Sequence, residues 1–413
     1  MPSTTALDFR ALLSTRAQIG QAVRGTIQSS TRTVQPPLYE FGGGRPDPGS
    51  FPYEGLIEAT RRMIEREGAE ALTYGDPLGY PGLRELVCRK YDLFEGLKVD
   101  PQNVLIANGS SHALSLAVSA FVDMGDPIIV EGPTFSGTLW AIRRHGPEVL
   151  DAPVDEEGVV TEVVRQRLES LRQQGRRCKL IYTIVNFQNP SGPTMSLRRR
   201  RELIALAHEY GTLILEDDAY GELRFEGEPL PSLYALDEGG AVIRSGTLSK
   251  ILGAGVRLGW LCAPPAMIPY LASFNFGGGV SPFMSRLAVY YMREHLAEHV
   301  RLLVGVYRDK RDAMRRGLLE LLDGSDAVVN KPEGGFFLWV KLPSGTDRQK
   351  LAELAADARV QYVPGPAFYP NGGGDEYIRL AYSYESVEKC YQGGRLLAEA
   401  ILAARSSSLP VSS

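Results

Sequence analysis

One lysine of this chain stands in a segment that could hold a small anionic molecule. Lys250 ends residues 245–250 (SGTLSK), shortly after the apolar residues 241–243, and Arg257 follows seven positions later. The hydroxyl groups and the guanidinium group could bind a phosphate, while the lysine amine could form a Schiff base with an aldehyde on the same molecule. Pyridoxal 5'-phosphate (PLP) carries both groups and is one interpretation. The other is an ordinary surface lysine in a Gly/Ser loop.

A second anion-binding segment is predicted where residues 108–112 (NGSSH) follow an apolar run and open a helical stretch. Backbone N–H groups at the N-terminus of a helix favour anions, and Ser110 and Ser111 add two hydroxyl groups. The alternative is an ordinary N-cap serine, which the same residues would also satisfy.

Three acids follow the apolar residues 213–215, in the sequence LILEDDAY that closes with Tyr220. Side chains alternate along a strand, so Asp217 should lie on the opposite face from Glu216 and Asp218. Placed opposite a pyridine nitrogen, Asp217 would keep that nitrogen protonated. Tyr220 could then reach the phenolic oxygen of the same ring.

Three further residues have both a chemical and an ordinary structural interpretation. Asn189, in the tight turn at residues 187–193, could donate to the phenolic oxygen of a pyridoxal ring or simply shape the turn. Phe135 could stack on a flat ring or belong to the core. Arg379 lies in an apolar strand pattern, where it needs either a substrate carboxylate or a buried salt bridge.

The elements that must position these residues follow an α/β pattern. Short apolar runs alternate with helical stretches between residues 103 and 262, which predicts a mostly parallel sheet with helices on both faces. Ligands bind beyond the carboxyl ends of such strands, where the motifs fall. We expect four parts: an N-terminal segment (1–50), a large domain (51–290), a smaller α+β domain with its bridging helix (291–405) and a disordered tail (406–413).

Composition argues against several classes of protein. The chain has 413 residues, 44% of them hydrophobic, and a net charge of −4, which favours neither nucleic acid nor an anionic membrane as a partner. Four scattered cysteines predict reduced thiols in the cytoplasm. No apolar run is long enough to span a bilayer, and the N-terminus lacks a signal-peptide pattern. His295 and His299 lie four positions apart, but their surroundings do not match a zinc protease, so no metal is expected.

As a set, the order and spacing of these motifs resemble the fold type I PLP-dependent aminotransferases. Residues 41–52 (FGGGRPDPGSFP) and 74–84 (YGDPLGYPGLR) are similar to the class I/II branch that contains the aminoadipate and kynurenine aminotransferases. The resemblance spans residues 40–404. It implies a large domain with a sheet of the seven-stranded type between helices, a smaller C-terminal domain, and PLP as the cofactor.

The resemblance also implies a role for each matching residue. Lys250 would form the Schiff base with PLP and shuttle the substrate proton, Asp217 would pair with the pyridinium nitrogen, and Arg379 would clamp the substrate α-carboxylate. Tyr74 would reach the phosphate of the neighbouring subunit, which makes a homodimer with shared active sites the functional unit. The other implied contacts are with the phenolic oxygen (Asn189, Tyr220), the ring face (Phe135), the phosphate (Ser110, Ser111, Thr247, Ser249, Arg257) and the substrate (Gly44, Arg45, Asn189).

Two positions depart from the family pattern. After the first phosphate serine, where relatives often carry a second amide-bearing residue, this chain has Ser111 and then His112, and His112 has no assigned role. Arg45 stands where relatives of the aminoadipate and kynurenine type often carry an apolar residue. If Arg45 points into the substrate site, it would favour donors with a distal carboxylate. If it points to solvent, it is a surface residue on a mobile gate.

The activity that the resemblance implies is transfer of an α-amino group from an L-amino acid to a 2-oxo acid, usually 2-oxoglutarate, by ping-pong half-reactions. Other PLP enzymes of this fold remain alternatives, namely a β-lyase, a decarboxylase or an amino-acid oxidase. A transcription regulator would need a winged helix-turn-helix domain before the glycine motif, and the roughly 40 preceding residues are too few for one. The identity of the amino donor stays open, because fold does not fix it.

Overall fold

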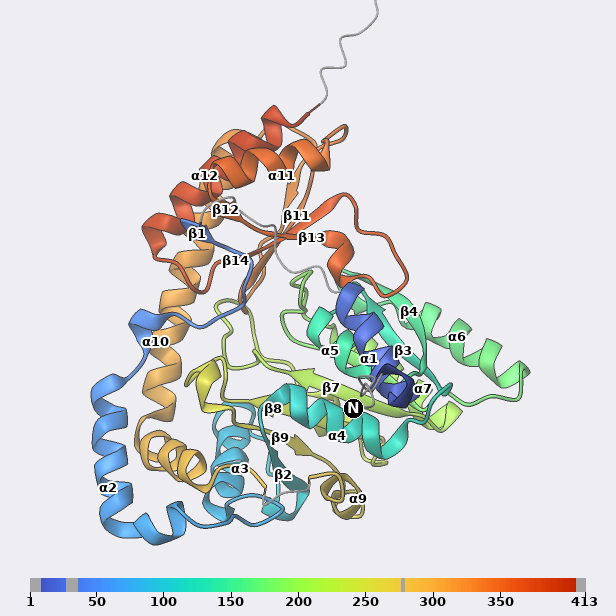
Figure 1. The fold of residues 1–413 in the computed structure, drawn as a ribbon, viewed down its shortest axis with the longest axis vertical. Coiled ribbons are helices and arrows are strands. Elements are labelled where there is room, and N and C mark those ends of the chain that lie inside the picture. Colours follow the sequence, from blue (N-terminus) through green and yellow to red (C-terminus); the bar gives the residue numbers. More distant parts are fainter. Residues whose placement is uncertain (1–8, 27–35, 276–278, 406–413) are drawn as a thin grey trace, which may run out of the picture.

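The protein is described here by a computed structural model, which covers residues 9–26, 36–275 and 279–405 (Figure 1). The predicted tail at residues 406–413 lies outside the described residues, as do parts of the predicted N-terminal segment. The described chain forms a large α/β body with a smaller α+β layer above it in the view of Figure 1. The predicted fold class is therefore confirmed.

The central sheet has eight strands in the order β2-β9-β8-β7-β6-β3-β4-β5. The five central strands from β8 to β4 run parallel, whereas β9 and β5 are antiparallel to their neighbours. Strands that are buried on both faces read as continuous apolar runs, as they do here. The bounds are β2 (Val104–Ala107), β3 (Pro127–Gly132), β4 (Glu148–Asp155), β5 (Gly158–Val159), β6 (Leu180–Ile184), β7 (Leu213–Asp218), β8 (Val242–Thr247) and β9 (Gly259–Cys262).

The apolar runs of the sequence locate six of these strands and miss β4 and β5. Only Ala152 is buried among the eight residues of β4, because this strand lies beside the edge of the sheet. It therefore has no continuous apolar run to reveal it. Strand β5 is only two residues long.

Helices cover both faces of this sheet. On one face lie α4 (Ser110–Phe121), α5 (Ser136–Arg143) and α9 (Ile268–Ala272), and on the other lie α6 (Thr161–Gln173) and α7 (Leu197–Tyr210). Local signals at the ends of α7 explain its bounds. The Ser196 side chain accepts a hydrogen bond from the backbone N–H of Arg199, and Gly211 ends the helix with a φ of 62°. The short α8 (Leu233–Leu236) follows β7.

The smaller layer is built on an antiparallel sheet in the order β10-β11-β14-β13. A separate pair, β1 (Tyr39–Glu40) with β12 (Val360–Gln361), joins the N-terminal segment to this layer. The remaining elements are β10 (Val328–Val329), β11 (Phe337–Lys341), β13 (Val363–Pro364), β14 (Tyr377–Ala381), α11 (Arg348–Asp357) and α12 (Val387–Ala403).

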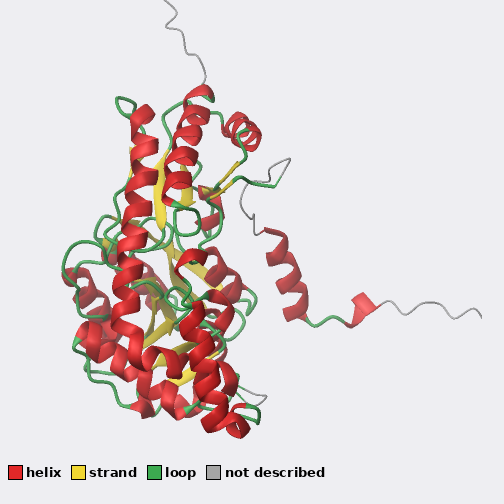
Figure 2. Cartoon of the chain, turned by 90° about the vertical axis from the view of Figure 1, so that its left-hand side faces the viewer, coloured by secondary structure: helices red, strands yellow, loops and turns green. Residues whose placement is uncertain are grey.

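A helix of 41 residues, α10 (Pro282–Leu322), runs through both layers (Figure 1). It packs against α2 (Tyr53–Ala71) and α3 (Pro81–Glu95) in the large body and against α12 in the smaller layer. The boundary that we expected after residue 290 falls inside this helix. The helix α1 (Thr15–Thr26) stands to one side of the main body (Figure 2). None of the helices that the structure describes is both long and apolar enough to cross a membrane.

Candidate active site

The end of β7 separates two neighbouring aspartates onto opposite faces of the sheet. Asp217 is buried, and its Oδ2 accepts a hydrogen bond of 2.7 Å from the hydroxyl of Tyr182. Its Oδ1 is buried without a hydrogen-bond partner. Asp218 instead forms an ion pair with the buried Arg244 and accepts from Asn186 at 3.1 Å. The two carboxylates therefore have different environments, as strand alternation requires.

These environments move the two pKa values in opposite directions. Burial raises the pKa of Asp217 to about 6, the hydrogen bond from Tyr182 opposes this shift, and the charge of Asp218 adds to it. Burial also disfavours the charge of Asp218, but Arg244 and Lys90 outweigh burial and hold the pKa of Asp218 below its usual range. Asp218 is thus satisfied within the protein, whereas Asp217 keeps one open oxygen.

Lys250 lies in the turn after β8, and its Nζ donates a hydrogen bond of 2.9 Å to the carbonyl of Gly44. The amine is 5.6 Å from the ring centroids of both Tyr220 and Phe336. Burial lowers the pKa of Lys250 to about 8, Arg379 adds to this shift, and Asp217 opposes it. The amine therefore loses its proton at a much lower pH than an ordinary lysine and is mostly neutral above pH about 8, which suits a group that accepts a proton.

Arg379 lies in β14 and is buried. Its Nη1 donates to Oδ1 of Asn189 at 3.0 Å, and its Nη2 donates to the carbonyl of Gly42 at 2.7 Å. Its Nε is buried without a partner. Among the described residues no carboxylate lies within ion-pair distance of it, so the buried salt bridge that we considered is not found in this part of the chain. Burial lowers the pKa of Arg379 to about 10.

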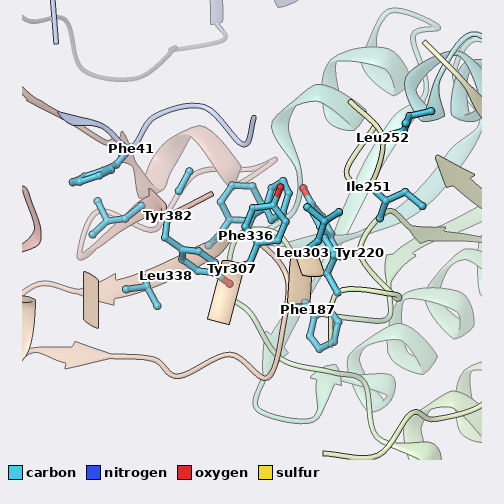
Figure 3. Close-up of a cluster of buried hydrophobic side chains, with 14 of the residues drawn as sticks. Phe41, Phe187, Tyr220, Ile251, Leu252, Leu303, Tyr307, Phe336, Leu338 and Tyr382 are labelled. Atoms are coloured by element: carbon cyan, nitrogen blue, oxygen red, sulfur yellow. The ribbon is translucent and has the colours of Figure 1, made fainter. Parts of the chain in front are cut away.

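Aromatic rings form a wall beside Lys250 and Arg379. Tyr220 packs edge-to-face against Phe336 and Phe337, with centroids 5.3 and 5.9 Å away, and the Arg379 guanidinium lies 4.2 Å from the centroid of Phe337. Figure 3 shows Tyr220 and Phe336 within a buried apolar cluster that also contains Tyr307. This cluster excludes water from one side of the charged groups, which strengthens their electrostatic interactions.

The predicted phosphate-binding segments meet at the start of α4. A Cβ on Gly259 of β9 would lie 2.5 Å from the carbonyl carbon of Gly109, so the two backbones approach closely. Arg257 donates from Nη2 to the carbonyl of Asn108 at 3.1 Å, which ties the second segment to the first. Among the described residues no carboxylate forms an ion pair with Arg257, so its charge is available to an anion.

Thr247 and Ser249, which lead into Lys250, place two hydroxyl groups next to each other. The hydroxyl of Thr247 is 2.9 Å from the hydroxyl of Ser249 and 2.9 Å from the carbonyl of Leu258, to which it donates. It also accepts a hydrogen bond from the backbone N–H of Ser249 at 3.0 Å. Ser249 is buried, Ser110 is half-buried and Ser111 is exposed. The chain thus brings a helix N-terminus, hydroxyl groups and a guanidinium group together, which is the composition of an anion site.

His112, which had no assigned role, accepts a hydrogen bond of 3.1 Å at Nδ1 from the backbone N–H of Asn108. An imidazole that accepts at Nδ1 must be neutral, and burial lowers the pKa of His112 accordingly. His112 therefore shapes the turn at residues 108–112 that opens α4.

Three other predicted residues differ in their contacts and exposure. Phe135 is half-buried at the start of α5 and its ring lies over Gly137, where a Cβ would be 2.6 Å away. Tyr74 is 88% exposed. Arg45 forms an ion pair with Glu40, and its guanidinium lies 3.9 Å from the ring centroid of Tyr384. Arg45 thus has partners within its own chain, an arrangement that neither of our two alternatives included.

Sequence reasoning missed several residues that contact this site. Tyr182 lies within an apolar strand, where a phenol needs a polar partner, and this was the signal that could have revealed it. Gln188 donates from Nε2 to the buried carboxylate of Glu131 at 2.9 Å and to the carbonyl of Pro133 at 2.7 Å, which fixes the loop before Asn189. Nothing local marks Glu131 as its partner.

Among the described residues, no group of three or more His, Cys, Asp or Glu side chains is arranged so that it could hold a metal ion. The Nε2 of His299 is 2.6 Å from the carbonyl of Ile251, while His295 packs on the ring of Tyr291. The four cysteines are free thiols.

Comparisons with known proteins place this site in a family. The model of the family "Aminotransferase class I and II" matches residues 45–390. An aromatic-amino-acid aminotransferase of Thermococcus litoralis is 38% identical over 88% of this chain and 88% of its own. A 2-aminoadipate transaminase of Thermus thermophilus is 34% identical over 91% of this chain and 95% of its own.

Solved structures agree with this match. The α-aminoadipate aminotransferase of Thermus thermophilus, complexed with N-(5'-phosphopyridoxyl)-L-leucine, superposes with a TM-score of 0.85 at 32% identity, covering 96% of this chain and 99% of that one. Family, relatives and fold therefore agree with the chemistry of the site, and the alternatives of a β-lyase, a decarboxylase or an oxidase are not favoured. The chain belongs to the class I and II aminotransferases and is a PLP-dependent transaminase of fold type I.

Proposed function

We propose that the active site for transamination is the region that Lys250, Asp217 and Arg379 enclose. The observation that carries this proposal is that Oδ1 of Asp217 and Nε of Arg379 are buried without a partner on two charged side chains that both act electrostatically on Lys250. Nε of Arg244 is also unpartnered, but that guanidinium group is already held by two ion pairs. Buried polar atoms are nearly always hydrogen-bonded, so such atoms are expected to face a ligand. The ring N–H of PLP fits the carboxylate oxygen, and a substrate α-carboxylate fits the guanidinium group.

Each residue then has a definite task. PLP, when bound, supplies an electron sink for negative charge at the substrate α-carbon. Asp217, with a pKa of about 6, is mostly ionised at neutral pH and holds the proton at the ring nitrogen. Arg379 fixes the α-carboxylate and so directs the α-hydrogen toward Lys250, whose Nζ accepts that proton and returns it. Asn189 and Tyr220 bind the phenolic oxygen.

The phosphate is assigned to the anion site at the start of α4. Arg257 supplies the charge, the first turn of the helix supplies backbone N–H groups, and four hydroxyl groups complete the set (Ser110, Ser111, Thr247, Ser249). Phe135 covers one face of the ring. These assignments follow the order of the motifs in the chain and the contacts described above.

We also propose a homodimer in which Tyr74 reaches the phosphate of the partner's cofactor. Large apolar side chains are exposed on α2, on the loop after it and around α9 (Tyr53, Ile57, Ile64, Leu72, Tyr74, Tyr270, Phe274). The side chain of Asn275 donates to the carbonyl of Pro77 at 2.9 Å and so joins the two regions. Extended apolar surface of this kind is typical of subunit interfaces.

Four free thiols favour a cytoplasmic location, where we place a biosynthetic role.

The donor class that the geometry favours is aromatic or apolar. The Arg45 charge is neutralised by Glu40, and the wall beside Lys250 consists of Tyr220, Phe336 and Phe337. Of the relatives above, one is named for aromatic amino acids and the other for 2-aminoadipate. The ion pair of Arg45 favours the first of these, with a 2-oxo acid such as 2-oxoglutarate as acceptor.

A half-reaction experiment tests this proposal directly. The PLP-loaded enzyme is mixed separately with phenylalanine, leucine, glutamate and 2-aminoadipate, and the absorbance of the bound cofactor is followed. We expect conversion to pyridoxamine phosphate with a kcat/KM at least about tenfold higher for phenylalanine than for 2-aminoadipate. Adding 2-oxoglutarate should then restore the original spectrum. A preference for 2-aminoadipate would contradict the donor class, and a spectrum that 2-oxoglutarate or another 2-oxo acid does not restore would contradict transamination.

A further inference from the structure

We propose that Tyr182, assisted by Thr138, is a positioning residue that orients Asp217 for the cofactor. Tyr182 lies in β6 and Asp217 in β7, which are parallel neighbours, and Thr138 lies in α5 on the same face of the sheet. This inference rests on the proposed role of Asp217 and extends it to two residues that no sequence motif marks.

The contact geometry of these three side chains supports a directed chain of hydrogen bonds. The phenolic oxygen of Tyr182 is 2.7 Å from Oδ2 of Asp217 and 3.1 Å from the hydroxyl of Thr138. All three residues are buried. The phenol has one proton, and a carboxylate is a stronger acceptor than a hydroxyl, so that proton goes to Asp217. The Thr138 hydroxyl then donates to the phenolic oxygen of Tyr182.

The hydrogen bond from Tyr182 gives the two carboxylate oxygens of Asp217 different roles. Oδ2 is held by Tyr182, while Oδ1 has no partner within the protein. A carboxylate that is fixed at one oxygen cannot rotate freely, so its other oxygen keeps a constant direction toward a ligand. Catalytic groups need such support from neighbouring side chains, since small errors in direction weaken the interactions that they make.

The bond also offsets an unfavourable electrostatic environment. Asp218 is the next residue along β7, and its negative charge disfavours ionisation of Asp217, as does burial. Glu131, a buried carboxyl at the end of β3, interacts unfavourably with the charge of Asp217. Lys250 is the cation that faces Asp217 and favours its charged form. Tyr182 is the neutral donor in this set, and burial raises its pKa well above 10, so it stays protonated throughout the working pH range.

Binding of PLP to the apoenzyme measures this positioning without relying on turnover. We compare the dissociation constant of PLP for the wild type, Tyr182→Phe and Thr138→Val across pH 5–8. Tyr182→Phe is expected to weaken PLP binding by about tenfold or more, as loss of a hydrogen bond to a charged group does, and Thr138→Val by a smaller factor. The Tyr182→Phe change should also raise the pKa of Asp217, so the pH below which affinity falls should move upward.

Tyr91→Phe is the matched control. Tyr91 is an equally buried phenol whose hydroxyl accepts a hydrogen bond of 2.7 Å from Trp260, but it lies on the other side of the sheet in α3. Tyr91→Phe should change the melting temperature of the apoenzyme. It should leave unchanged both the dissociation constant of PLP and the acidic limb of the pH profile, which is the pH range in which PLP affinity falls as the pH is lowered. A purely structural role for Tyr182 would give the same result as this control.

The variant Asp217→Asn shows whether a negative result contradicts only the positioning role of Tyr182 or the proposed active site as a whole. If Asp217→Asn weakens PLP binding while Tyr182→Phe and Thr138→Val behave as the control does, the site stands and the positioning role is wrong. If Asp217→Asn has no effect either, the proposed site itself is wrong. Should Tyr182→Phe not fold, Thr138→Val decides, since it removes only the outer hydroxyl, and an unchanged acidic limb in that variant overturns the proposal.

Discussion

Nη1 of Arg379 donates a hydrogen bond of 3.0 Å to Oδ1 of Asn189, although the two residues are 190 positions apart in the chain. Arg379 belongs to the smaller layer, and Asn189 follows β6 of the large one. The same asparagine is proposed to bind the phenolic oxygen of PLP, and the same arginine is proposed to bind the substrate. One hydrogen bond therefore links the proposed cofactor site to the proposed carboxylate clamp.

Replacing Lys250 with alanine is expected to abolish turnover while PLP binding remains measurable. The phosphate site and Asp217 are left in place, but the amine that accepts the α-hydrogen is lost. Borohydride reduction followed by peptide mapping should find the cofactor on Lys250 in the wild type and on no residue in the variant. A cofactor fixed at another lysine of the variant would sink the assignment.

The two neighbouring aspartates should fail in different ways. Asp217→Asn is expected to lower kcat/KM by ~100-fold or more, since it removes a charge that faces the reacting system, with little loss of apoenzyme stability. Asp218→Asn weakens an ion pair with the buried Arg244 and should lower the free energy of unfolding by about 1.5–3 kcal/mol. Steady-state kinetics and urea unfolding of both variants test this. Greater loss of kcat/KM in Asp218→Asn would show that our side-chain assignment on β7 is wrong.

Capture of PLP by the apoenzyme should follow the ionisation of Lys250. Only the neutral amine attacks an aldehyde, and the lowered pKa means that the neutral form dominates above pH about 8. The rate of covalent capture should therefore rise with pH and level off above that value, far below the usual range for lysine. Arg379→Gln removes a positive charge that lowers this pKa, so its midpoint should move upward. Stopped-flow absorbance provides the measurement.

Arg45→Leu should change kcat/KM equally for an aromatic and an acidic donor, because Arg45 is already paired with Glu40. Glu40→Gln is the informative partner variant. It frees the guanidinium group, and we expect kcat/KM for 2-aminoadipate to rise several-fold relative to phenylalanine. A selective loss of about tenfold with the acidic donor in Arg45→Leu would instead place Arg45 in the specificity site.

Complementation between two inactive variants tests the shared active site. If Tyr74 serves the partner's cofactor, a mixed dimer of Tyr74→Ala and Lys250→Ala subunits contains one site with neither change. Mixing the two variants under subunit exchange should restore up to about a quarter of wild-type activity, since half of the dimers are mixed and each has one intact site. Sedimentation should show a dimer at micromolar concentration. A fully active monomer would contradict the model.

Buried strands were predictable from sequence because both of their faces are apolar, so β3, β6 and β7 each appear as a continuous apolar run. Alternation along β7 also predicted the separation of Asp217 from Asp218. Long-range partners were not predictable in this way. The contact of Tyr182 with Asp217, the pairing of Arg45 with Glu40 and the contact of Gln188 with Glu131 depend on directions of side chains that only the packed fold defines. The assignment of the site residues itself stays a prediction, which the experiments above test.

The pairing of Tyr39 with Val360 sets an order of events during synthesis of the chain. Gly42 and Gly44 follow directly after β1, and their carbonyls accept hydrogen bonds from Arg379 and Lys250. They can dock only after the ribosome has released the segment around Val360, which is made after every strand of the central sheet. The large layer can fold earlier, because domains generally fold as units from the N-terminal side. A nascent chain that already has the central sheet therefore still lacks its substrate side, and activity arises only when β1 pairs with β12.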